Sequence, residues 1–306
     1  MAEASLPDGT GAMGRNRKAY FSVVFQRGVT PTLIQGVLDR DSSLAGRGIR
    51  ALEYAFGHQN PDGSFPFEPP AEYTGKQPGP GDLASAAAFF FSELGRSLCL
   101  LESSDWFQTN PDAANLRVRL QAVRGKADLS LTWLMSQQEE LEAFDGQTAN
   151  RLFFDALAFY LTGRALGRTD AMDAGESFAL SAMRLRTSDG ILLEKGGFDS
   201  SYQGVSLFRA LILYVHADSG RIEFRRQLWK TIAQGVQWEL SRVLPTGEIS
   251  TEGNARVYPG GEDFLGNEKA VAYADVALAF YYYAVLAGDP GVKQAADNVI
   301  GYYANR

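Results

Sequence analysis

Two short stretches of the sequence place ionisable and polar residues at the starts of expected helices. Asn150 and Arg151 open NRLFFDALAFYLTGRALG, and Asp199 and Tyr202 belong to GGFDSSYQGVSLFRALILY. An arginine pairs bidentately with a carboxylate, an asparagine hydrogen-bonds one, and a phenol beside a cation can transfer a proton. These residue types therefore suit recognition of an acidic ligand with proton transfer next to it.

Each of these residues also has a structural alternative. Asn150 and Asp199 have the side chains that helix N-caps use, so capping and ligand contact are comparable readings. Arg151 is also suited to an ion pair with Asp155, four residues further along the same expected helix. Tyr202 is also suited to burial with its hydroxyl group in one hydrogen bond.

Further candidates lie in the loops that precede apolar helices. His58 ends an expected helix beside the turn Asp62-Gly63, where it could exchange protons with a substrate, whereas His216 is interpreted as structural. Loop aromatic side chains can stack on sugar faces, and loop polar side chains can hydrogen-bond hydroxyl groups. The candidate substrate-binding residues are Asp199, Gln203, Tyr73, Phe65, Arg256, Tyr258, Asn267, Glu268 and Lys269.

The elements that must position these residues are helices. Apolar residues recur at helical spacing through most of the chain, which predicts an all-α protein. The expected helices cover 30–38, 47–58, 83–101, 113–138, 149–166, 171–186, 201–217, 222–243, 268–286 and 291–303. The helices at 83–101, 152–166 and 271–286 are apolar on more than one face, which predicts burial on most sides.

A turn with glycine recurs before each of four apolar helices. The glycines are Gly63, Gly146, Gly190 and Gly247. This degenerate repeat of helical hairpins predicts a single α/α toroid over residues 19–306, after a flexible tail of residues 1–18. The segments after the four glycines should then converge on one hollow, where helix N-termini with free N–H groups favour an anionic ligand.

Composition excludes several classes of function. A formal net charge of −7 and a pI near 5.0 give no basic surface for nucleic acid. Two histidines and one cysteine, Cys99, make a zinc site hard to assemble, and we expect no metal and no cofactor. No run of about 18 apolar residues is present, so we expect no membrane partner. The sequence gives no prediction of oligomeric state.

The N-terminal stretch bears on the compartment. MAEASLPDGTGAMGRNRK is polar and glycine-rich, without the apolar centre of a signal peptide. We expect a cytoplasmic protein, or a periplasmic or secreted one if a signal peptide has been removed.

The hairpin alternation, with NRLFFDALAFYLTGRALG and GGFDSSYQGVSLFRALILY, resembles the α/α-toroid carbohydrate-active enzymes. These are polysaccharide lyases of the alginate and chondroitin lyase type and the unsaturated glucuronyl hydrolases. The resemblance implies cleavage of a uronic-acid-containing polysaccharide or oligosaccharide by β-elimination. It implies that Asn150 and Arg151 neutralise the uronate carboxylate, that Tyr202 is the base or acid, and that His58 is its partner. The Asn-His pairing of those lyases is absent, because Arg151 follows Asn150.

Other readings stay open. A toroid glycoside hydrolase would use a carboxylate pair, for which Asp199 would be joined by Asp155, Glu252, Asp263 or Glu268. RALEYAFGHQNPDGSF is similar to the QW repeat of triterpene cyclases and to the helical turns of prenyltransferases, although Asp39-Arg40-Asp41-Ser42 lacks the paired aspartates those cyclases need. A non-catalytic glycan-binding protein would keep the loop aromatic residues and would tolerate loss of Tyr202.

Overall fold

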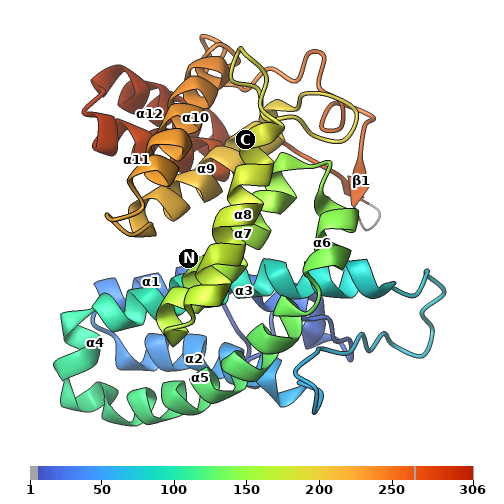
Figure 1. Ribbon diagram of the computed structural model, residues 1–306, viewed down its shortest axis with the longest axis vertical. Helices are drawn as coiled ribbons and strands as arrows, with labels where there is room; N and C mark the ends of the chain where they lie inside the picture. Colours follow the sequence, from blue (N-terminus) through green and yellow to red (C-terminus); the bar gives the residue numbers. More distant parts are fainter. Residues whose placement is uncertain (1–5, 265–266, 306) are drawn as a thin grey trace. The chain divides into compact units, whose positions relative to one another are not determined.

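The computed structural model describes residues 6–264 and 267–305 and is all-α (Figure 1). This confirms the predicted fold class. The chain packs as two compact units. Unit 1 comprises Met1–Phe144 with Phe154–Glu176, and unit 2 comprises Asp145–Phe153 with Ser177–Arg306. The expected single domain and the closed toroid stay predictions.

Unit 1 is built from helical hairpins whose starts follow local capping rules. Asp41 is the N-cap of the second helix, where its side chain accepts from the Ser43 and Leu44 N–H groups. The elements are η2 (Gly14–Arg17), η3 (Val23–Gly28), α1 (Val29–Leu38), α2 (Ser42–Gly57), α3 (Pro80–Ser103), α4 (Asp105–Thr109), η4 (Pro111–Ala113), α5 (Ala114–Met135) and α6 (Gln138–Asp145), with most of α7 (Ala149–Leu166) and the first half of α8 (Thr169–Arg184).

Unit 2 continues the helical hairpins and adds one small β-hairpin. It contains the start of α7 and the second half of α8. Its other elements are α9 (Ser200–His216), α10 (Ile222–Leu240), β1 (Asp263–Phe264), β2 (Asn267–Glu268), α11 (Tyr273–Ala287) and α12 (Pro290–Ala304). The last hairpin is closed by Gly288 in the left-handed conformation, and Asp289 caps the following helix. The expected helix 268–286 begins later, at Tyr273, because Asp263 pairs with Glu268 and Phe264 with Asn267.

Four turns in the described chain share one geometry. In each, the glycine N–H donates to the carbonyl three residues earlier, and the φ angle of the glycine is between 87° and 98°. A Cβ on any of these glycines would lie 2.2–2.6 Å from a helix carbonyl oxygen, so no other residue fits there. The glycines, each with its facing carbonyl, are Gly11 with Arg50 of α2, Gly63 with Leu129 of α5, Gly190 with Gln234 of α10, and Gly247 with Asn298 of α12.

Three of these four turns were expected from sequence, and the turn expected at Gly146 is present with a different geometry. Gly146 does not occupy this position, because the turn after α6 is closed by the Thr148 N–H donating to the Asp145 carbonyl. Gly11 supplies the fourth copy instead. The expected flexible tail covers residues 1–18, of which 1–5 lie outside the described residues. In the described part, Met13 and Asn16 are buried.

The buried helices agree with the apolar patterns in part. In α3, the side chains of Phe90, Phe91 and Leu94 are fully buried, as expected. By length and composition α3 could also cross a membrane, but 72% of that apolar window is buried inside the protein, as in a core helix. The expectation fails for α11, where Val285 is 81% exposed.

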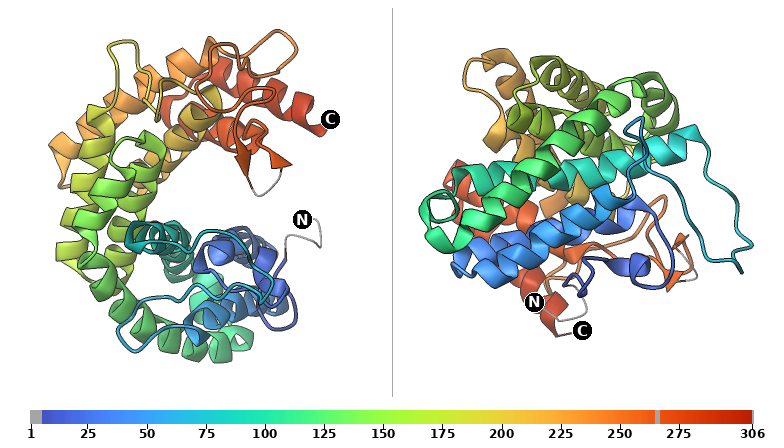
Figure 2. Two further views of the ribbon diagram at one scale, coloured as in Figure 1. Left: turned by 90° about the vertical axis from the view of Figure 1, so that its right-hand side faces the viewer. Right: turned by 90° about the horizontal axis from the view of Figure 1, so that it is seen from below.

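The loop between α2 and α3 is a long irregular excursion, visible in both views of Figure 2. Two of its aromatic rings, Phe67 and Tyr73, form a row of partly exposed rings with Tyr20, which precedes η3. Tyr20 packs edge-on against Phe67, and Phe67 against Tyr73, each pair with ring centroids 5.5 Å apart. These contacts give the loop a defined aromatic surface within unit 1.

Candidate functional site

Tyr202 lies in the first turn of α9, where Asp199 fixes the backbone. The Asp199 side chain accepts from the Tyr202 N–H at 3.1 Å and also from the Arg256 and Val257 N–H groups at 3.1 and 2.7 Å. Asp199 thus caps the helix and joins it to the loop that precedes α11. Burial raises the pKa of Asp199, although its three backbone hydrogen bonds oppose the shift.

The carboxylate of Glu262 is the centre of the polar cluster in unit 2. It accepts from Tyr202 Oη at 2.9 Å and from Arg256 Nη2 at 2.8 Å, and Lys269 Nζ lies 3.1 Å away. Lys269 Nζ also donates to Tyr202 Oη. Burial opposes ionisation of Glu262, but these three donors outweigh it and lower the pKa of Glu262 to about 2.

Positive charge surrounds the Tyr202 ring. The Arg256 guanidinium lies 4.2 Å from the ring centroid and the Lys269 ammonium 5.1 Å from it. Burial lowers the pKa of Lys269, and the charges of Arg256 and Arg151 lower it further, against Glu262. Burial and the hydrogen bond to Glu262 raise the pKa of Tyr202 above its usual range, against Arg256, so the phenol holds its proton at neutral pH.

Glu194 is a functional candidate that the sequence interpretation missed. Its carboxylate accepts from the Asn150 N–H at 2.9 Å and pairs with Arg256 Nη1 at 3.2 Å. Burial raises the pKa of Glu194 to about 7, against these two partners. The available signal was an acidic residue directly after the apolar run Ile191-Leu192-Leu193.

Two of the helix N-terminal N–H groups that we expected to be free for an anionic ligand are bonded within the protein. At α7 the Asn150 N–H donates to Glu194, and at α9 the Tyr202 N–H donates to Asp199. The protein's own carboxylates therefore satisfy these groups.

Two expected substrate-binding residues of unit 2 are corrected by their burial. Gln203 is fully buried, its Oε1 accepts from the Leu192 N–H at 2.8 Å, and its Nε2 donates to the Gly190 carbonyl at 3.0 Å. Asp199 is also fully buried and capped by backbone donors. Neither side chain has a surface left for a substrate.

The remaining expected residues of unit 2 lie around the cluster. Arg151 pairs with Asp145 at 2.8 Å and remains one-third exposed. Asn150 is buried, and its Oδ1 has no hydrogen-bond partner in the part of the chain that the structure describes. Tyr258 is 43% exposed, Asn267 and Glu268 are exposed in β2, and Glu268 accepts from the Gly260 N–H.

Two of the expected substrate-binding residues, Phe65 and Tyr73, lie in unit 1 and make contacts within it. Phe65 is corrected: it is buried and packs against Phe56, Phe90 and Phe91. Tyr73 is partly exposed and donates to the Lys76 carbonyl.

His58 is fixed by a neighbouring acid and a neighbouring ring. Its Nδ1 lies 3.0 Å from Glu68 Oε2, and its ring stacks on Phe21 with centroids 3.9 Å apart. The proposed partnership of His58 with Tyr202 stays a prediction.

Residues of the alternative readings have structural roles. Asp41 is a helix cap, and Asp39 accepts from Gln35. Cys99 is buried, and burial raises the pKa of its thiol to about 11. Among residues 6–264 and 267–305, no group of three or more His, Cys, Asp and Glu side chains could hold a metal ion.

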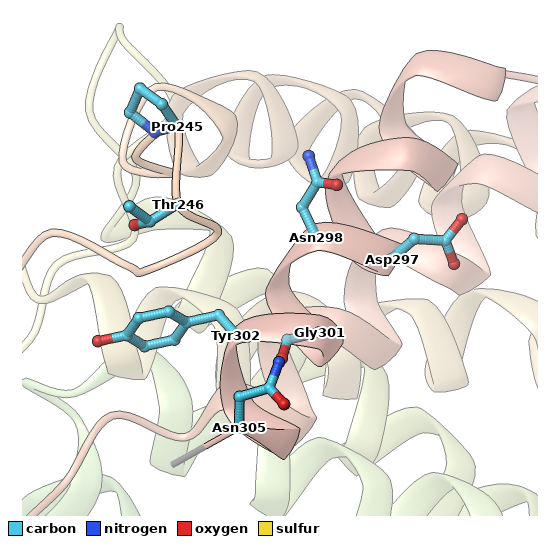
Figure 3. A pocket seen from close by; sticks show the side chains of 7 residues that line it. All are labelled: Pro245, Thr246, Asp297, Asn298, Gly301, Tyr302 and Asn305. Atoms are coloured by element: carbon cyan, nitrogen blue, oxygen red, sulfur yellow. The ribbon is translucent and has the colours of Figure 1, made fainter.

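A separate hollow of about 410 Å³ lies between the turn at 244–248 and α12. Figure 3 shows Pro245 and Thr246 on the turn, with Asn298 and Tyr302 on the helix. None of its lining residues belongs to the Glu262 cluster. The only charged residue among those that line it is Asp297, which pairs with Lys293. This hollow and the ionisable Glu262 cluster therefore lie at different places in unit 2.

Comparison with solved structures gives a likeness of fold. No protein-family model matches the sequence, and no curated protein matches it. Among the solved structures that are similar is a polysaccharide lyase, with a TM-score of 0.53 and 12% sequence identity. The match covers 97% of this chain and 40% of the lyase chain, so this chain spans well under half of the length of that protein.

Proposed function

We propose that unit 2 recognises the carboxylate of a uronic-acid-containing saccharide and cleaves the adjoining glycosidic bond by β-elimination. One observation carries the proposal: Arg256, Tyr202 and Lys269 all direct a donor to a single carboxylate, that of Glu262. A guanidinium, a phenol and an ammonium together form a site for a carboxylate. In the free protein Glu262 fills that site.

A substrate carboxylate takes the place of Glu262. Glu262 is 28% exposed and lies next to β1, on a loop, so it can move without unfolding a helix. Arg256 stays anchored by Glu194 as Glu262 leaves. Arg151, whose charge acts on Lys269, adds to the field that attracts the acid although the whole chain is negative.

Neutralising the carboxylate makes the C5 proton of a uronic acid easier to remove. Lys269, which binds the carboxylate as an ammonium, can take that proton only after it has released one of its own to solvent, and burial and two arginines favour this neutral amine because they lower its pKa. The C5–H electron pair forms the C4–C5 double bond and the C4–O bond breaks. Tyr202, which holds its proton at neutral pH, delivers it to the departing oxygen.

The fold likeness to a polysaccharide lyase supports the same class of chemistry. The hydrolase alternative has less support, since two of its candidate carboxylates, Asp199 and Asp155, are buried. A hydrolase needs both carboxyl groups in contact with the substrate.

The test is incubation with alginate, polygalacturonate and chondroitin while the ultraviolet absorbance of the new double bond is followed. We expect absorbance to rise with at least one of these and to be lost in Tyr202→Phe. Tyr303→Phe is the matched control, because Tyr303 is 52% exposed on α12 and outside the cluster. It should retain full activity.

Lys269→Arg separates binding from chemistry. Arginine keeps the positive charge but does not give up its proton in proteins, so the carboxylate should still bind while turnover is lost. New reducing ends without the absorbance would contradict elimination, and full activity of Tyr202→Phe would contradict the role of Tyr202 as the proton donor.

A further inference from the structure

A hollow of about 430 Å³ in unit 1 has a different chemistry from the Glu262 cluster. Its walls include Tyr20, Phe21, Tyr54, His58 and Glu68. All lining residues lie between Asp8 and Pro69, so the hollow belongs to unit 1 alone. Its volume is within the range of small-molecule sites in proteins.

Backbone hydrogen bonds hold part of the wall of this hollow in place. The Phe21 N–H donates to the Glu68 carbonyl at 2.7 Å, and the Glu68 N–H donates to the Phe21 carbonyl at 2.9 Å. This bridge holds the Glu68 side chain beside the stacked rings of Phe21 and His58, whose planes differ by 10°. Ala19, on the rim, has a φ angle of 46°, which is costly for a residue with a side chain.

Polar groups remain available at the mouth of the hollow. His58 Nδ1 is engaged by Glu68, which leaves His58 Nε2 and the second Glu68 oxygen without a hydrogen bond in the described chain. The Glu68 side chain is 54% exposed and that of His58 is 30% exposed. A ligand can therefore reach one carboxylate oxygen and one ring nitrogen next to aromatic surface.

The charge around the hollow disfavours an acid. Asp8 and Glu68 line it, together with one cation, Arg17. Hydrogen bonds from Thr10 and the backbone lower the pKa of Asp8 despite slight burial, so it is ionised at neutral pH. Arg17 donates to the carbonyls of Leu6 and Ala12. The Glu262 cluster differs in having three cations, Arg151, Arg256 and Lys269, beside its carboxylates.

We propose that unit 1 carries a second binding site, which takes a neutral pyranose at this hollow. The apolar face of the sugar ring lies against Tyr54 or Tyr20, and its hydroxyl groups donate to Glu68 and bond to His58 Nε2. The site needs neither Tyr202 nor elimination. Its failure and that of the proposed lyase activity can therefore be told apart.

The experiment uses the full chain and follows His58 by NMR, which is direct because the chain has only two histidines. The probes are methyl glucoside, methyl galactoside, methyl mannoside and the corresponding uronates. We expect at least one neutral glycoside to shift the His58 ring resonances and not those of His216. The corresponding uronate should bind at least tenfold more weakly, and Tyr202→Phe should respond like the wild type.

Variants at Glu68 give the second readout. Glu68→Ala should weaken binding about tenfold, since it removes a charged hydrogen-bond acceptor. Glu72→Ala, an exposed acid on the same loop, should leave the affinity unchanged. An unshifted His58 with every neutral glycoside, preference for a uronate, or a shift produced only by a cation such as tetramethylammonium would each overturn the proposal.

Discussion

Gln26 in unit 1 and Gln203 in unit 2 make the same three hydrogen bonds. Each Oε1 accepts from the N–H two residues after a turn glycine, that of Met13 or Leu192. Each Nε2 donates to that glycine's carbonyl, Gly11 or Gly190. Each Nε2 also donates to a helix carbonyl, that of Ala51 or Gly235. This residue directly follows the helix residue that the glycine faces.

Gln26 and Gln203, each with its three hydrogen bonds, form two glutamine clamps. The clamps differ in the residues that precede the glutamine. Phe25 precedes Gln26 and contacts Tyr20, whereas Tyr202 precedes Gln203 and joins the Glu262 cluster. The clamp is therefore scaffold, and the chemistry comes from neighbouring residues that one unit has and the other lacks. This explains why Gln203, which has the right type and position for a ligand contact, has a structural role.

The largest expected effect concerns the turn that each clamp holds. Gly11→Ala and Gly190→Ala should each destabilise the protein by more than about 3 kcal/mol, because the new Cβ would lie 2.4 Å from a helix carbonyl oxygen at a positive φ angle. Chemical unfolding measures this. Gly57→Ala, with open space around its Cβ position, is the control and should cost nothing. Equal effects at Gly57 and Gly190 would refute the shared turn.

The second prediction concerns Glu194, which pairs with Arg256 of the Glu262 cluster and so tests the difference between unit 2 and unit 1. Its folded-state pKa of about 7 lies above the ordinary value of 4.5, so its protonated form is favoured by folding. Stability should fall by up to about 3 kcal/mol as pH rises from about 4.5 through 7. Glu194→Gln should flatten this slope in urea unfolding curves.

The control for the pH slope is Glu223→Gln, at an exposed carboxylate of α10 whose pKa is about 2 because of its hydrogen bonds from Arg226 and Gln227. It should keep the wild-type slope between pH 4.5 and 7. The same slope in Glu194→Gln as in the wild type would show that another group titrates there.

The smallest expected effect tests the clamps directly. Gln26→Leu and Gln203→Leu should each cost about 2 kcal/mol, because each leaves a buried N–H and buried carbonyl groups unsatisfied. Gln121→Leu, at an exposed site on α5, should be neutral. A large loss at one glutamine and none at the other would break the equivalence of the two units.

Much of the scaffold could be predicted from sequence because glycine turns and helical periodicity are local signals. Gly63, Gly190 and Gly247 were identified in this way. Gly11 was missed because Thr10-Gly11 lies in a stretch that is polar and glycine-rich, which is typical of a tail.

The site was harder to predict, since side-chain direction depends on tertiary packing. Tyr202, Arg256 and Lys269 were identified because they lie in loops or first turns that carry unexplained polar residues. Glu194 was missed because burial beside Arg256 cannot be inferred from a lone acid after an apolar run. Phe65 was misassigned because its partners Phe90 and Phe91 are distant in sequence.

Glu262 occupies a carboxylate site formed by Arg256, Tyr202 and Lys269. Calorimetric titration of galacturonate and glucuronate into the wild type and Glu262→Gln tests it most directly. Removing the internal carboxylate leaves the cations uncompensated, so Glu262→Gln should bind at least one uronate about tenfold more tightly than the wild type. Unchanged or weaker binding by Glu262→Gln would contradict the account.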